Sequence, residues 1–388
     1  MVDTYVVDAV RTPFGRRRGS LSQTRADELA AANLRGLVTR SGIDPAQVED
    51  VILGCVTPLG EQGFNVARVA LLIAGFPVEV PGVQVNRMCG SSQQAVHFGA
   101  QAIMAGQMDL VIAGGIEAMS RVGMGSDGGD FSQRLTDKYL MVPQGISAEM
   151  IADKWNLSRE DLDRFSLESH RKAAAAQDAG RLDRETMPVE TTFEGRPVTV
   201  AKDEGIRRET SMEKMAALQP SFKTDGKVTA ANASQISDGA AMVLLASEKK
   251  AAELGLTPIA RIVATAVVGV DPTIMLTGPL TATPKVLKKA GLKLQDIDLF
   301  EVNEAFASVP LAWLAETKAD PARLNVNGGA IALGHPLGAS GARLIMTTAY
   351  ELERRRARYG LVTMCIGLGL GTATIIERVS WGGFPDGG

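Results

Sequence analysis

Two cysteines and a histidine in this sequence stand in settings that favour nucleophilic and acid–base chemistry. Cys89 lies in VNRMCGSSQQA (85–95), between a strand-like run and a helix-like run. Unpaired N–H groups at the start of a helix favour an anion, so we expect the pKa of the Cys89 thiol to fall below its free value of about 8.5. The alternative is a buried cysteine that acts as a small hydrophobic residue.

Cys365 and His335 are the other candidates. Cys365 begins CIGLGLG, in which Gly367, Gly369 and Gly371 leave backbone N–H groups that a ligand could approach closely. The packed end of a strand is the alternative for Cys365. His335 lies in NGGAIALGHPLGASGAR (327–343), a glycine-dense turn ahead of a helix, where a histidine is suited to general-base catalysis.

The remaining candidates are weaker. Thr372 stands where a dinucleotide-binding G-x-G-x-x-G motif would need its third glycine, which argues against a dinucleotide site. His97 lies mid-helix and His170 among charges, so both are expected to be structural or solvated. Asn303, in VNEAFAS (302–308), ends a predicted strand, where it could serve a reaction or simply form a turn.

Composition excludes several classes of protein. The chain has 388 residues, 45% of them hydrophobic, and a net charge of −3, which gives no electrostatic case for nucleic acid or anionic membrane. Three cysteines without a CxxC motif predict neither a disulfide framework nor a metal site. The longest apolar stretch (69–78) is too short to span a membrane, and no signal region begins the chain, so we expect a cytoplasmic protein. The arginine clusters at 16–18 and 354–356 indicate solvated faces or a partner that carries phosphates.

Short strand-like runs alternate with helical ones, which predicts an α/β fold. In the first half we expect strands at 4–10, 50–56, 82–86 and 109–115 and helices at 26–40 and 92–106. The second half repeats this pattern: 257–270 corresponds to the first strand, 290–302 to 41–53, 324–329 to the strand before Cys89, and 358–367 to 109–115. Residues 120–234 fall outside the repeat.

The repeat predicts two homologous halves with an insertion. We assign 1–119, completed by 235–256, to the first half, 120–234 to an inserted loop domain with a helix near 158–179, and 257–388 to the second half. The turns that bear Cys89 and His335 are then equivalent, and Cys365 ends the strand after His335. Pseudo-twofold pairing of the halves would bring all three to one crevice.

Six blocks together resemble the thiolase family, the acetyl-CoA C-acyltransferases. The blocks run in order along nearly the whole chain: NRMCGSSQQA, GGIEAMSR (114–121), NASQISDGAA (232–241), NEAFA (303–307), NGGAIALGHPLGASGAR and CIGLG. The resemblance implies duplicated βαβαβαββ halves in a five-layered αβαβα sandwich with a loop domain. It also implies cleavage of a 3-oxoacyl-CoA by coenzyme A, or the reverse Claisen condensation.

The resemblance assigns roles by matching position. Cys89 would be acylated, Cys365 would act as general acid and base, and His335 would activate Cys89 and, with water held by Asn303, form one oxyanion hole. The N–H groups of Cys89 and Gly367 would form the other. Coenzyme A would be a substrate rather than a bound cofactor, with contacts at Arg207 and Ser234, and the chain would form a homodimer or homotetramer.

Two departures and two alternatives accompany this expectation. Pro143-Gln144-Gly145 replaces the His-Met-Gly of many small-acyl members, and Leu368 replaces a glycine of the usual Cys-x-Gly-Gly-Gly. The blocks look most like those of actinobacterial degradative thiolases. A catalytically silent protein that binds acyl-CoA or lipid is one alternative. A decarboxylating ketoacyl synthase is the other, although such enzymes use one catalytic cysteine and need no base like Cys365.

Overall fold

The computed structural model describes residues 2–379 of the chain. Its main sheet has the strand order β10-β11-β12-β9-β1-β8-β5-β3-β4, and β2 (Gly15–Arg16) pairs with β8 beside this path. The sheet divides into two similar parts, because β1 (Thr4–Arg11) and β9 (Ala260–Gly269) pair only through Tyr5 with Arg261 and Val6 with Ala260. Each half of the chain therefore builds its own group of strands.

In the first half, three parallel strands lie beside two antiparallel ones. β4 (Gly82–Val85), β3 (Asp50–Gly54) and β5 (Leu110–Ala118) run parallel, and β8 (Ser237–Ser247) is antiparallel to β5 and β1. Every residue of β5 and β8 is buried, which fits strands covered on both faces. The accompanying helices are α1 (Ala26–Ser41), α2 (Val66–Ala74), α3 (Ser91–Met104) and α8 (Glu248–Glu253), with short 3-10 turns at η1 (Pro45–Gln47) and η2 (Gly60–Gln62).

The second half repeats this order with one strand fewer. β10 (Leu299–Val302) is parallel to β11 (Tyr359–Ile366), and β12 (Leu370–Arg378) is antiparallel to β11 and β9. Its helices are α9 (Gly278–Ala290), α10 (Ser308–Thr317), α11 (Ala330–Leu333) and α12 (Ser340–Arg355), with 3-10 turns at η3 (Met275–Thr277), η4 (Leu294–Asp296) and η5 (Pro321–Arg323). The equivalent helices α1 and α9 both end at a left-handed glycine, Gly42 and Gly291, which confirms the repeat.

The strand predicted at 324–329 was wrong. Only Leu324 bridges Phe300 there, because Asn325 (φ 44°) and Gly328 (φ 77°) take left-handed conformations that leave the extended region. The side-chain amide of Asn325 instead bonds both backbone groups of Val302: its Nδ2 donates to the Val302 carbonyl and its Oδ1 accepts from the Val302 N–H, each at 2.9 Å. One side chain thus substitutes for a strand neighbour at this edge of the sheet.

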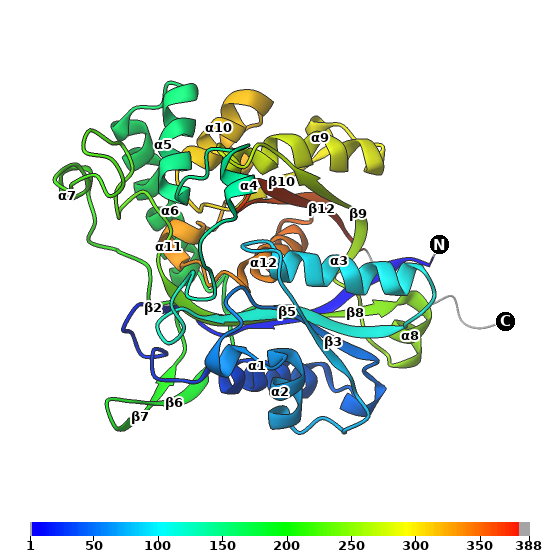
Figure 1. Cartoon of the computed structure of the whole chain (residues 1–388). Coiled ribbons are helices and arrows are strands. Elements are labelled where there is room, and N and C mark those ends of the chain that lie inside the picture. Colours follow the sequence, from blue (N-terminus) through cyan, green and yellow to red (C-terminus); the bar gives the residue numbers. More distant parts are fainter. Residues whose placement is uncertain (1, 380–388) are drawn as a thin grey trace.

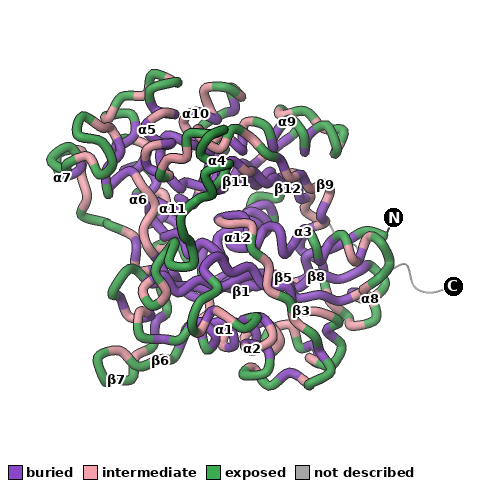
Figure 2. The backbone as a smooth tube through the Cα atoms, viewed as in Figure 1, coloured by how far each residue is buried: buried purple, intermediate pink, exposed green. Residues whose placement is uncertain are grey.

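The elements stack in five layers (Figure 1). α1 and α2 cover the outer face of the first half's strands, and α9 and α10 cover that of the second half's strands. Between the strand layers lie α3 and α12, whose backbones approach so closely that a Cβ on Gly341 would lie 2.5 Å from the Gln93 nitrogen. Figure 2 shows buried residues concentrated in the strands and in these two central helices. This five-layered αβαβα arrangement confirms the predicted fold.

Between β5 and β8 the chain leaves the layers. This segment contains a two-stranded sheet and several helices: α4 (Gln133–Thr136), α5 (Gln144–Lys154), α6 (Arg159–Asp178), β6 (Val189–Phe193), β7 (Arg196–Val200) and α7 (Met212–Ala216). α6 begins at Ser158, whose side chain accepts from the Asp161 N–H while Asp161 accepts from the Ser158 N–H. The segment meets the second half where Ser234 N–H donates to the Ala305 carbonyl at 2.9 Å.

Candidate active site

Cys89 lies in the tight turn between β4 and α3. Met88 takes a left-handed conformation (φ 46°), and the Ser91 hydroxyl closes the turn by accepting from the Arg87 N–H (2.9 Å) and donating to the Met88 carbonyl (2.6 Å). The cysteine is only 3% exposed. A strained turn held by side-chain hydrogen bonds thus fixes the thiol at the start of the central helix.

The pKa of Cys89 differs from the sequence-based expectation. Burial raises the pKa of this thiol to about 11, although the N–H groups of Gly367 and of Cys89 itself oppose the shift. The predicted lowering at a helix start was therefore wrong, because desolvation of a thiolate outweighs the backbone dipoles. A thiol with a raised pKa needs a nearby base if it is to act as a nucleophile.

His335 lies in the loop between α11 and α12, with its ring buried. The Ser340 hydroxyl donates to the Pro336 carbonyl (2.8 Å), so it accepts from His335 Nδ1 across 2.6 Å. His335 Nε2 therefore keeps its lone pair, which faces the Asn303 Nδ2 donor at 3.2 Å. Burial, assisted by Arg343, lowers the pKa of His335 to about 3, so the imidazole is neutral. A neutral ring with its lone pair on Nε2 can accept a proton there by giving up the hydrogen bond from Asn303.

Asn303, Cys365 and Gly367 come from the ends of β10 and β11. Asn303 is 1% exposed, its N–H donates to the Thr363 carbonyl at 3.0 Å, and its Oδ1 has no partner among the described residues. Cys365 is fully buried, and burial, together with the charge of a Cys89 thiolate, raises its pKa. The turns that carry the two thiols pack against each other, because a Cβ on Gly90 would lie 2.4 Å from Ile366 Cδ1 and a Cβ on Gly367 would lie 3.8 Å from Met88 Cγ. The five predicted catalytic residues thus form one connected set.

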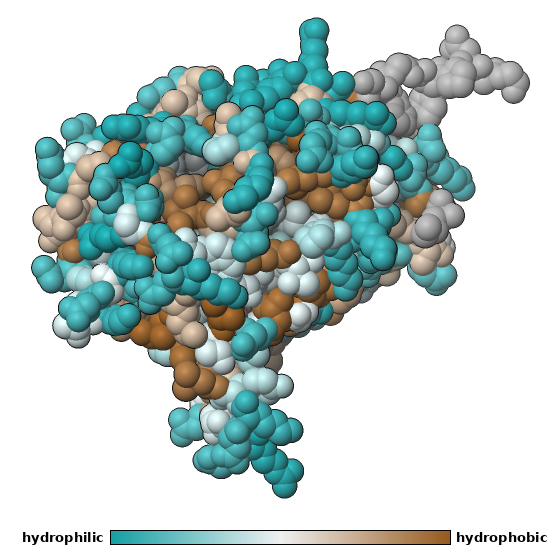
Figure 3. All heavy atoms as spheres, turned by 90° about the horizontal axis from the view of Figure 1, so that it is seen from above, coloured by the Kyte–Doolittle hydropathy of each residue, from teal (hydrophilic) through white to brown (hydrophobic). Residues whose placement is uncertain are grey.

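A cavity of about 280 Å³ opens beside this set. Cys89, His335 and Ser234 line it, and its walls are otherwise mainly apolar, including Met124, Phe222, Ile236, Leu276, Phe306 and Leu337. Among the described residues, no Lys, Arg, Asp or Glu contributes to the lining. Figure 3 shows apolar atoms gathered in the middle of one face of the molecule, with polar side chains around them.

Arg207 lies in a separate cavity that shares one lining residue with the first. This second cavity, of about 470 Å³, is lined by four cationic side chains (Arg16, Arg207, Arg208 and Lys214) and two acidic ones (Glu204 and Glu209), and Gln235 borders both cavities. Gln235 Nε2 donates to the carbonyls of Gly205 and Ile331, each at 2.8 Å, and so fixes the boundary between them. The structure therefore places Ser234 in the same cavity as Cys89 and Arg207 in the neighbouring one.

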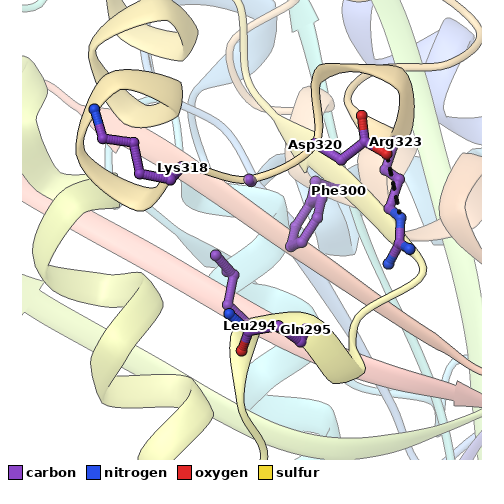
Figure 4. Close-up of a pocket in the computed structure, with 7 residues that line it drawn as sticks. Leu294, Gln295, Phe300, Lys318, Asp320 and Arg323 are labelled. Atoms are coloured by element: carbon purple, nitrogen blue, oxygen red, sulfur yellow. Dashed lines mark ion pairs between the residues drawn. The ribbon is translucent and has the colours of Figure 1, made fainter.

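The other two histidines and a further hollow lie outside these two cavities. His97 and His170 are buried, and burial lowers the pKa of the first to about 3 and of the second to about 4. A hollow between η4 and the start of β10 contains neither cysteine nor histidine; the Phe300 ring points into it, beside an ion pair of Arg323 with Asp320 (Figure 4).

Sequence analysis missed Ser340, which follows His335 in the same quoted block, and Glu117, which lies within GGIEAMSR. Ser340 could have been found as a hydroxyl near a candidate base, and Glu117 as a single carboxylate in an apolar strand.

The helices in the described part of the chain are all too short or too polar to span a membrane.

Comparison with known proteins identifies the family. The thiolase N-terminal domain model matches residues 4–249, and the thiolase C-terminal domain model matches residues 256–378. Steroid 3-ketoacyl-CoA thiolase FadA6 of Mycobacterium tuberculosis is 52% identical over 98% of this chain and 95% of its own length. The 3-oxoadipyl-CoA/3-oxo-5,6-dehydrosuberyl-CoA thiolase of Escherichia coli is 46% identical over 98% of this chain and all of its own.

A solved structure agrees. The Bacillus anthracis acetyl-CoA acetyltransferase superposes with a TM-score of 0.91 at 38% identity, covering 98% of this chain and 99% of that one. The expected family resemblance is confirmed: the chain belongs to the thiolase family of acyltransferases.

Proposed function

We propose that this enzyme cleaves a 3-oxoacyl-CoA with coenzyme A, giving acetyl-CoA and an acyl-CoA shortened by two carbons, and that it can run the reverse Claisen condensation. The observation that carries the proposal is the pair of buried thiols, Cys89 and Cys365, beside a neutral His335 whose Nε2 lone pair is available. A nucleophile and a separate acid–base group are what this reaction needs, because it breaks a carbon–carbon bond and moves a proton to carbon.

In the first half-reaction, His335 Nε2 accepts the Cys89 proton as the sulfur attacks the 3-oxo carbon. The Cys89 and Gly367 N–H groups stabilise the oxyanion that forms. The bond between C2 and C3 then breaks, leaving an acyl-Cys89 and an acetyl-CoA enolate. The His335 N–H and a water held by Asn303 stabilise the enolate oxygen, and Cys365 donates its proton to the enolate carbon.

In the second half-reaction, the Cys365 thiolate accepts the proton of an incoming coenzyme A thiol. That sulfur attacks the acyl-Cys89 carbonyl, and the shortened acyl-CoA leaves while the Cys89 thiol regains its proton from His335. Each oxyanion-hole donor of this kind typically lowers a barrier by about 3 kcal/mol. A decarboxylating condensing enzyme has no need of the second thiol, which favours thiolysis.

Coenzyme A would lie across residues 120–234, which we propose act as a loop domain between the two halves, 1–119 with 235–256 and 257–388. Ser234, which lines the thiol cavity, would contact pantetheine. Arg207, in the neighbouring cationic cavity, would contact the phosphates, supported by Arg16 and Lys214. Coenzyme A would enter and leave as a substrate, and we place the enzyme in the cytoplasm.

We also propose that the chain assembles as a homodimer, which could pair further into a tetramer. β4 ends the main sheet and leaves one side without a strand neighbour among the described residues. Exposed apolar side chains lie around it: Phe64 is 98% exposed and Val78 69%, and Leu72, Ile73 and Val83 are also exposed. Such an edge favours pairing with a second copy. Light scattering should give at least twice the chain mass, and a Val83→Lys substitution should shift the protein towards monomer.

The function is tested by trapping the acyl-enzyme. Exposure to 3-oxooctanoyl-CoA without free coenzyme A should add a hexanoyl mass to the peptide that contains Cys89, and not to the one that contains Cys55. Acetoacetyl-CoA and coenzyme A should give acetyl-CoA, and the Cys89→Ala variant should not. Full activity in that variant, or strict dependence on malonyl-CoA, would contradict the proposal. The ratio of kcat/KM for short and bulky 3-oxoacyl-CoA substrates then defines the acyl preference.

A further inference from the structure

Glu117 is a buried carboxylate at the end of β5, outside the set of reacting groups described above. Its side chain is fully buried, and it accepts four N–H groups at 2.8–3.1 Å. The donors are the backbones of Val56, Thr57 and Gly338 and the side chain of Gln62. So many donors on one carboxylate indicate a junction between chain segments rather than a single stabilising contact.

One side of this junction leads to the Cys89 turn. Glu117 Oε2 accepts from the Val56 N–H at 2.9 Å, and the Val56 carbonyl accepts from Asn86 Nδ2 at 2.9 Å. Asn86 Oδ1 then accepts from the N–H of Met88 at 2.8 Å. Met88 is the residue before the nucleophile, so an unbroken series of hydrogen bonds connects the carboxylate with the Cys89 turn.

The other side leads to the His335 loop. The same Oε2 atom accepts from the Gly338 N–H at 2.9 Å, three residues beyond His335. The backbones touch here as well: a Cβ on Gly115 would lie 2.0 Å from the Gly338 carbonyl oxygen, and a Cβ on Gly338 would lie 2.2 Å from the Ile116 oxygen. Strand β5 of the first half therefore packs directly against the His335 loop, which belongs to the second half.

A glutamine could not replace this group. A carboxylate offers only acceptors, and Oε2 alone holds one donor from each half of the chain. With its oxygen at the Oε2 position, an amide would keep the Val56 and Gly338 contacts but direct its NH2 group at the Thr57 N–H and Gln62 Nε2 donors, which would push the 56–62 segment away from β5. Burial raises the pKa of Glu117 to about 7, while the surrounding N–H groups oppose that shift. The Glu117 charge also raises the pKa of the nearby Cys89.

We propose that Glu117 is a positioning residue for the reaction: its carboxylate sets the distance between the Cys89 turn and the His335 loop by holding both through backbone N–H groups. The inference rests on the proposed thiolase function. A displacement of about 1 Å between reacting groups can cost on the order of 100-fold in rate. We expect Glu117→Gln to lower kcat by about that factor while KM for the acyl-CoA stays within threefold.

The matched control is Asp298→Asn. Asp298 accepts the backbone N–H groups of Arg358 and Tyr359 at 2.8 and 2.9 Å, and so also ties two segments together. It lies at the opposite end of β11 from Cys365, about 20 Å away at roughly 3.3 Å per strand residue. Its substitution should lower the melting temperature and leave kcat within twofold of wild type.

Alkylation of Cys89 by iodoacetamide provides a second measurement that needs no turnover. Removing the Glu117 charge should lower the thiol pKa, so the pH midpoint of alkylation should move down in Glu117→Gln while kcat also falls. A purely structural role of Glu117 would not lower the pH midpoint of Cys89 alkylation while kcat falls. If Glu117→Gln does not fold, Glu117→Asp keeps the charge but shortens the reach, and kcat should fall at least tenfold with an unchanged alkylation midpoint.

Two outcomes would overturn the inference: kcat of folded Glu117→Gln within twofold of wild type, or an equal loss of kcat in Asp298→Asn. Failure of the proposed function would look different, because wild-type protein would then cleave no 3-oxoacyl-CoA. The alkylation comparison would still report whether Glu117 influences Cys89.

Discussion

Replacing Ser340 with alanine tests what holds the imidazole of His335 in place. The Ser340 hydroxyl accepts from His335 Nδ1 at 2.6 Å and donates to the Pro336 carbonyl at 2.8 Å, which keeps the proton on Nδ1 and the lone pair on Nε2. Alanine leaves the buried Nδ1–H without its acceptor, which costs about 1–3 kcal/mol. The ring can avoid this cost by rotating or by moving the proton to Nε2, and both remove the base from Cys89.

The rate should reflect that cost. At about 1.4 kcal/mol per tenfold, we expect kcat/KM to fall by roughly 10- to 100-fold, through slower acylation of Cys89 in a single-turnover assay. Ser166→Ala is a matched control, because the buried Ser166 also donates to a carbonyl four residues earlier, that of Leu162 at 2.7 Å, but forms no hydrogen bond with an imidazole of the described residues. If Ser340→Ala acylates Cys89 within twofold of wild type, the histidine is not oriented by this hydroxyl and the assignment of Nε2 as base fails.

Three further substitutions test other parts of the structure. Cys365→Ala should slow deuterium exchange at the acetyl-CoA α-carbon by about 10²- to 10⁴-fold but leave Cys89 open to iodoacetamide; retained exchange would exclude Cys365 as the base. Gly115→Ala should lower both stability and kcat because its methyl group meets the Gly338 carbonyl, whereas Gly123→Ala, with open space around it, should be near neutral, and unfolding midpoints with steady-state rates check both. His97→Gln should make the protein less sensitive to acid. Burial holds the pKa of His97 at about 3, so its stabilisation is present above about pH 6.5 and lost as the pH falls. Urea unfolding at pH 7.5 and 5.0 should show a wild-type loss larger than the variant's by about 2 kcal/mol, and equal losses would count against a neutral His97.

Much of the architecture was readable because it follows from local patterns. Helix-ending glycines at 42 and 291 recur at equivalent places, and both adopt the left-handed conformation that ends a helix. Runs of apolar residues marked β5 and β11, which are buried along almost their whole length. The one predicted strand that did not form is 324–329. There the Asn325 side chain, and not a strand, hydrogen-bonds to the backbone of Val302, and this contact between distant residues cannot be read from a local pattern.

The candidate catalytic residues could be proposed from the sequence, since Cys89, His335 and Cys365 occupy equivalent or neighbouring turns of a duplicated fold. Their ionisation states could not be predicted in this way. A helix start predicted a lowered thiol pKa, yet burial raises it to about 11. The solvent exposure of Cys89 depends on how the two halves pack over its turn, and a local sequence pattern does not predict that packing.

The sequence by itself determined which side chains could react and which elements carry them, because residue type and periodicity are local properties. The tertiary structure alone decided the protonation states, the histidine tautomer and the position of Glu117 between the Cys89 turn and the His335 loop. These depend on solvent exclusion and on hydrogen bonds between residues as far apart as 117 and 338, which only the packing of one half against the other brings together.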